Sequence, residues 1–140
     1  MITVEEIIDF TKKELKEKDI FSDTDIFSLG IYGDDMDEFL GSYHKKYNVN
    51  FDHYLWYFHN EEENSSNISI GKLFFKRPYD RVKRIPITPE LLAKFANTKV
   101  WEIDYPNHQI PKFRYDVLID QIIFGGLALI IIYFSLKKYF

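Results

Sequence analysis

Apolar side chains recur at helical spacing in the first third of the chain. The clearest series occupies positions i, i+3, i+4, i+7 and i+11 and consists of Met36, Phe39, Leu40, Tyr43 and Tyr47. Such a stripe is typical of an amphipathic helix that packs one face on a core. We therefore predict a helix over residues 35–47, preceded by an apolar loop that folds back onto the same core.

Two further helices are indicated by the residues that would begin them. Thr3 and Glu6 have the spacing of a capping box, and the apolar pattern after them predicts a helix over residues 3–18. Thr88 followed by Pro89 is typical of an N-cap and the first helical position. The apolar residues after Pro89 predict a third helix that ends near Asn97.

The segment between these helices is less regular. The aromatic residues of 53–58 favour a short helix or an extended segment on the core, and residues 61–67 read as a polar loop. Residues 68–75 contain alternating isoleucines and a pair of phenylalanines, which favour a strand. We expect Trp101 to close the core of a domain over residues 1–104.

The C-terminal stretch is apolar all round. Residues 117–136 would span about 30 Å as a helix, which matches the hydrocarbon core of a bilayer. Apolar residues contribute about −0.3 to −0.6 kcal/mol each, which together outweigh about 3 kcal/mol for Asp120. The alternative, a buried helix of a soluble protein, would be hard to cover in so small a domain. We predict a transmembrane helix over residues 116–137 after a linker over 105–115.

The flanks of this helix leave its orientation open. Lys112 and Arg114 precede the span and Lys137 and Lys138 follow it, so the basic residues balance. The first eighteen residues form a charged amphipathic pattern without the apolar region of a signal peptide. We therefore expect a C-terminal anchor and a domain on the cytoplasmic side.

Composition narrows the chemistry. The chain has no cysteine, which excludes disulfides, thiolate catalysis and cysteine-ligated metals. His53 and His59 do not have the spacing of a zinc site, and no catalytic motif is present. Residues 1–63 hold 16 acidic and 6 basic residues, whereas residues 64–140 hold 6 and 12. The two halves can therefore attract each other or face different partners.

Four acids gather at the start of the second predicted helix: Asp34, Asp35, Asp37 and Glu38. Asp34 is placed to cap the free backbone N–H groups, and the other carboxylates are favoured by the helix dipole. These acids could form a metal-binding or acid–base catalytic site. The simpler interpretation is that they cap the helix and keep the surface soluble. The acids are also a candidate surface for a basic protein partner.

A basic run follows the predicted strand. It is interleaved with aromatic residues and contains Lys76, Arg77, Arg81, Lys83 and Arg84. Next to a membrane span, such a run is a candidate for binding anionic lipid headgroups. The alternative is a solvated segment that pairs with the acidic first half, and nucleic acid is not an expected partner.

The order of these elements resembles the acyl carrier protein fold. Asp34-Asp35-Met36-Asp37 stands where carriers have Asp-Ser-Leu-Asp, and Ile87-Thr88-Pro89 resembles the lead into their last helix. The pattern Gly30-Ile31-Tyr32-Gly33-Asp34-Asp35, with Val100-Trp101, is similar to a bacterial family of unknown function related to acyl carriers. The match covers residues 3–101. It implies a mainly α, carrier-like helical bundle followed by the membrane helix.

The resemblance also bears on chemistry. Carriers attach phosphopantetheine to a serine at the position that matches Asp35, and a carboxylate cannot form that phosphodiester. We therefore expect the fold without the cofactor: a non-enzymatic module whose acidic second helix docks a basic partner at the bacterial inner membrane. The alternatives are a carrier loaded on another residue and a basic lipid-binding membrane protein.

Overall fold

The computed structural model describes residues 1–62 and 69–139, and over these residues the protein is mainly helical. The α-helices are α1 (Val4–Leu15), α2 (Gly33–Tyr47), α3 (Gly71–Phe74), α4 (Pro89–Thr98) and α5 (Tyr115–Tyr139). Three 3₁₀ turns lie between them: η1 (Ile26–Ser28), η2 (Trp56–Phe58) and η3 (Pro78–Arg81). The predicted fold class, mainly α with a long apolar C-terminal helix, is confirmed.

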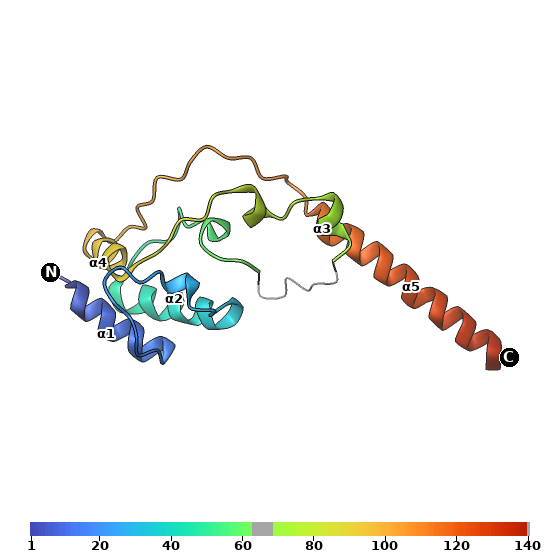
Figure 1. Cartoon of the computed structure of the whole chain (residues 1–140), viewed down its shortest axis with the longest axis horizontal. Coiled ribbons are helices and arrows are strands. Elements are labelled where there is room, and N and C mark those ends of the chain that lie inside the picture. Colours follow the sequence, from blue (N-terminus) through green and yellow to red (C-terminus); the bar gives the residue numbers. More distant parts are fainter. Residues whose placement is uncertain (63–68, 140) are drawn as a thin grey trace.

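Helices α1, α2 and α4 enclose one hydrophobic core (Figure 1). The predicted stripe of α2 supplies five of its side chains, and the Phe10 ring of α1 packs at an angle against three of their rings. The remaining core residues come from all parts of the domain: Ile7, Ile26, Phe27, Val49, Ile87, Leu92, Ala93, Phe95, Ala96 and Trp101. These three helices and their core are called the bundle below.

Two of the predicted helix starts are confirmed in atomic detail. The side chain of Thr3 accepts a hydrogen bond from the Glu6 backbone at 3.2 Å, and that of Thr88 accepts one from Leu91 at 3.3 Å. Each threonine satisfies a backbone N–H that has no partner inside its helix. Helix α1 is shorter than predicted, because Lys16 adopts a left-handed conformation after Leu15.

The start of α2 differs from the prediction. The helix begins at Gly33, its N-cap is Tyr32, and no side chain caps it, so Asp34 is not the cap. Gly33 has a φ of 56°, a conformation that L side chains rarely adopt. This glycine turns the chain into the helix one residue before Asp34, which places Asp34 and Asp35 inside the first turn. There the carboxylates meet the positive end of the helix dipole.

The predicted strand over residues 68–75 is wrong for the residues the structure describes. Residues 71–74 form α3, a single helical turn, and residue 68 lies outside the described part of the chain. The helix forms because a distant carboxylate, described below, binds the backbone at its start. Most of the polar loop predicted over residues 61–67 also lies outside the described residues.

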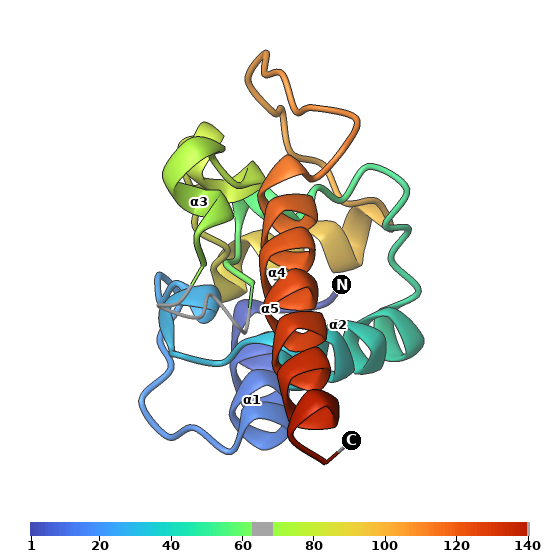
Figure 2. The ribbon, with the colours of Figure 1, turned by 90° about the vertical axis from the view of Figure 1, so that its right-hand side faces the viewer.

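Helix α5 projects away from the bundle (Figure 1), and in the turned view of Figure 2 it stands in front of the rest of the chain. Its 25 residues correspond to about 37 Å, and its most apolar 18-residue window has a mean hydropathy of 2.3 with no residue buried in the protein. Helix α3 lies beside its first turns. The helix is therefore long and apolar enough to cross a membrane, and the protein itself does not cover it.

Candidate functional site

The four predicted acids of α2 all point to solvent. Asp34, Asp35, Asp37 and Glu38 are exposed, whereas Met36 between them is buried in the core. Within residues 1–62 and 69–139, none of these carboxylates has a basic partner within ion-pair distance. We call these four residues the acidic surface.

The acidic surface borders a groove on one side of α2. Asp37 lines a groove of about 430 Å³ together with Tyr54, Trp56 and Glu61. Carboxylates and aromatic faces are the two groups that attract a lysine or arginine side chain. The groove therefore has the chemistry to bind a cationic side chain.

Two other acids of the surface face a different hollow. Asp35 and Glu38 line a hollow of about 230 Å³ with Lys16, which lies at the end of α1. The four acids are thus not one cluster. Asp37 thus faces one hollow and the pair Asp35 and Glu38 another, and Asp37 is the acid that lines a hollow with Tyr54 and Trp56.

The predicted basic residues divide into two groups. Arg84 pairs with Asp25 and donates to the His59 carbonyl at 3.0 Å, and Arg77 pairs with Asp80 at 3.2 Å. Both arginines are thereby used inside the domain. The other three are exposed, and the ion pairs of the described residues do not include them: Lys76, Arg81 and Lys83.

The contact between α3 and α5 was not anticipated from the sequence. Asp120 of α5 accepts hydrogen bonds from the backbone N–H groups of Ile70 and Gly71, both at 2.8 Å, and from Ser69 Oγ at 2.6 Å. The carboxylate thus occupies the free donors at the start of α3. Gly71 packs so closely that a Cβ there would lie 1.9 Å from the Asp116 carbonyl oxygen.

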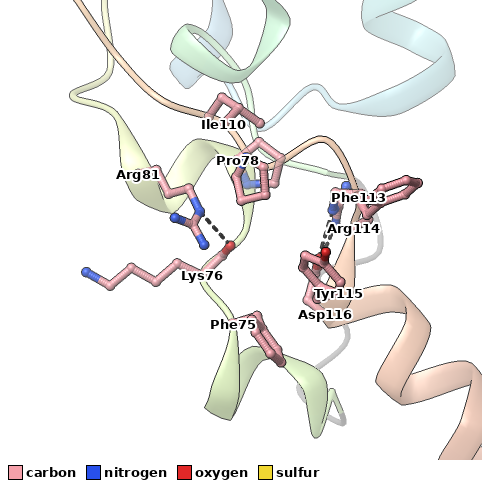
Figure 3. A pocket seen from close by; sticks show the side chains of 10 residues that line it. Phe75, Lys76, Pro78, Arg81, Ile110, Phe113, Arg114, Tyr115 and Asp116 are labelled. Atoms are coloured by element: carbon pink, nitrogen blue, oxygen red, sulfur yellow. Dashed lines mark hydrogen bonds and ion pairs between the residues drawn. The ribbon is translucent and has the colours of Figure 1, made fainter.

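Arg114 completes this contact, which we call the α3–α5 junction. Its guanidinium donates to Asp116 at 2.9 and 2.6 Å and to Glu62 at 3.0 Å. Hydrogen bonds with these two carboxylates, Asp116 first, raise the pKa of Arg114 above its usual value. Figure 3 shows Lys76 and Arg81 on one side of the small pocket at this junction and Phe113 and Tyr115 on the other.

The sequence carried only one signal for this junction. Asp120 is an acid at the start of an otherwise apolar run, and such a residue needs partners. Its partners are backbone groups some fifty residues earlier in the chain. Because any residue type supplies a backbone N–H, no side-chain pattern identifies them.

His59 is held in a buried network. Its Nδ1 lies 2.8 Å from the Ile85 carbonyl oxygen, so Nδ1 carries the proton, and Nε2 accepts from the Tyr105 hydroxyl at 2.8 Å. Tyr105 also accepts from the Trp101 indole at 2.9 Å, which ties the start of the predicted linker to the core. Burial lowers the pKa of His59 to about 4.

These hydrogen bonds show whether His59 could act as a metal ligand. Both ring nitrogens are engaged, so the residue is part of the core and does not offer a lone pair to a metal. Among the described residues, no group of three or more His, Cys, Asp or Glu side chains could hold a metal ion.

Comparison with known proteins gives no match to a family model, a curated protein or a solved structure.

Proposed function

We propose that this protein is a non-enzymatic interaction module, anchored in a membrane by α5, whose acidic surface on α2 docks a protein partner with a basic surface. The bundle is carrier-like, and Asp35 stands in place of a loaded serine. The bundle lies on the cytoplasmic side, which leaves α5 as a C-terminal anchor in a bacterial inner membrane.

The observation that carries this proposal is the exposure of the acidic surface beside an aromatic groove. The ion pairs of the described residues do not include these acids, whereas Arg84, for example, pairs with Asp25. The acids of α2 lie in solvent, and Asp37 lines one groove with Tyr54 and Trp56. A basic side chain from a partner would find both a carboxylate and an aromatic ring there.

Site-specific photo-crosslinking tests the docking surface. A benzophenone residue at Ser42, on the half-buried side of α2 next to the acids, would be activated in membranes that contain the full-length protein. We expect a discrete cross-linked species that disappears when Asp34, Asp37 and Glu38 are all changed to lysine. The loss follows because charge reversal removes the attraction for a basic partner.

A matched variant controls for net charge. Asp9, Glu17 and Asp19 are exposed acids outside α2, and changing them to lysine alters the charge by the same amount. This control should keep the cross-linked species. A species that survives reversal of the α2 acids, or that is lost equally in both variants, would contradict docking by the acidic surface.

A further inference from the structure

Helix α3 exposes two large apolar side chains although it is held firmly in place. Leu73 is 76% exposed and Phe74 is 70% exposed, whereas Gly71 on the opposite side is buried against α5. A four-residue helix with such side chains in water is unfavourable, because the exposed apolar area gains nothing from burial. The exposure of Leu73 and Phe74 is explained if these side chains meet an apolar surface outside the domain.

The length of α5 places α3 at a definite depth if α5 crosses a membrane. A hydrocarbon core of about 30 Å needs about 20 helical residues. With Lys137 and Lys138 at the far interface, counting back 20 residues from Leu136 reaches Val117. Val117 lies between Asp116, which packs against Gly71, and Asp120, which binds the backbone at the start of α3.

The bonding of α3 suits this depth. Backbone donors near the hydrocarbon need partners within the protein, and Asp120 accepts from Ile70 and Gly71. The same bonds satisfy the one acid inside the apolar run of α5. At the other end of α3, the Phe75 ring packs against Tyr115 with ring centroids 5.4 Å apart. Tyrosine, like tryptophan, is enriched at membrane interfaces.

The residues after α3 change from apolar to basic. Lys76 and Arg81 are exposed, and Arg81 Nε donates to the Lys76 carbonyl at 3.0 Å, which holds the two residues together. Basic side chains that close to a span meet the phosphates of lipid headgroups. The apolar residues Leu73 and Phe74 are thus followed in the chain by the basic residues Lys76 and Arg81. A segment that enters one leaflet of a membrane has this order of apolar and basic residues.

We infer that α3 is a second membrane-contact site, in which Leu73 and Phe74 enter the acyl layer next to α5 and Lys76 and Arg81 lie among the headgroup phosphates. This inference rests on the proposed anchoring by α5. It adds that α5 is not the only membrane contact, because α3, held against the first turns of α5, meets the same leaflet.

Spin labels in a lipid bilayer test the inference. The chain has no cysteine, so single labels can be placed at Leu73→Cys, at Ile130→Cys in the middle of α5 and at Lys13→Cys on the exposed surface of α1. The full-length protein is reconstituted in vesicles of zwitterionic and anionic phospholipids. Collisions with oxygen report lipid, and collisions with a water-soluble nickel chelate report solvent.

The three labels test the membrane contact of α3 separately from the anchoring by α5. We expect the label at Leu73 to resemble that at Ile130 in favouring oxygen several-fold over the label at Lys13. If Ile130 favours oxygen and Leu73 resembles Lys13, the contact by α3 is contradicted and the anchor stands. If the label at Ile130 favours nickel, the anchor fails and the inference fails with it.

Discussion

The bundle and the α3–α5 junction are held together by different interactions. In the bundle, three helices bury apolar and aromatic side chains, and burial is non-directional and proportional to area. In the junction, Asp120, Arg114 and a backbone contact at Gly71 make a few specific bonds at fixed geometry. The bundle should therefore tolerate conservative changes, whereas the junction should fail at single positions.

The largest effect is expected in the bundle core. Replacing Phe39, which is buried in α2, by alanine should lower the free energy of unfolding by about 3–5 kcal/mol. Both tryptophans belong to the domain, so urea unfolding in detergent can be followed by their fluorescence without interference from α5. The control Phe21→Ala removes an exposed ring and should change stability by no more than about 0.5 kcal/mol. Equal effects of the two changes would contradict the assigned core.

The next largest effect is a pH dependence that arises from buried His59, beside the bundle. His59 has a folded-state pKa of about 4 against an ordinary value of 6.5. The unfolded chain therefore takes up a proton first, and stability present above pH 6.5 is lost as the pH falls toward 4. The loss amounts to about 3 kcal/mol.

Urea unfolding at a series of pH values checks this contribution. The variant His59→Phe keeps an aromatic ring in the core and cannot take up the proton. Its stability should fall less steeply between pH 6.5 and 4 than that of the native protein, whatever its absolute stability. Identical slopes for the two proteins would assign the pH dependence to other groups.

A single methyl group should break the junction. Gly71→Ala places a Cβ 1.9 Å from the Asp116 carbonyl oxygen, so α3 must move away from α5 at a cost of about 1–3 kcal/mol. We expect faster amide hydrogen exchange at Ile70 and Gly71, whose N–H groups lose Asp120. The unfolding of the bundle, measured by tryptophan fluorescence, should remain the same.

Gly41→Ala is the matched control for this change. Gly41 lies in α2, and a Cβ there would meet no atom within 4 Å. Alanine should leave exchange at the junction unaltered and favour α2 by about 0.5–1 kcal/mol. Unchanged exchange at residues 70 and 71 in Gly71→Ala would show that the close approach to Asp116 is not needed.

The smallest effect is expected for an exposed ion pair on the bundle. Lys94 Nζ lies 3.5 Å from Glu102, and both side chains are about half exposed. Lys94→Ala should change the free energy of unfolding by less than about 1 kcal/mol, because solvent and salt screen such a pair. A larger loss would mean that charged contacts matter as much in the bundle as in the junction.

The sequence predicted the parts of the fold that depend on periodic burial and local capping. The stripe from Met36 to Tyr47, the caps at Thr3 and Thr88, and the apolar run of α5 all use neighbours within one helix. The exposure of the acidic surface was also predictable, since its members alternate with core residues along α2. Its role in docking a partner stays a prediction.

Only the tertiary structure decided what α3 is and which charges are used internally. Residues 69–75 alternate like a strand, but Asp120 binds the backbone at Ile70 and Gly71 and makes one helical turn the better conformation. Likewise, Arg84 and Lys76 belong to the same basic run of the sequence. Of these two residues, only Arg84 forms an ion pair with a carboxylate. The physical reason is the same in both cases. These hydrogen bonds and ion pairs join groups far apart in the chain, whereas the hydrophobic periodicity of a helix depends only on residues within that helix.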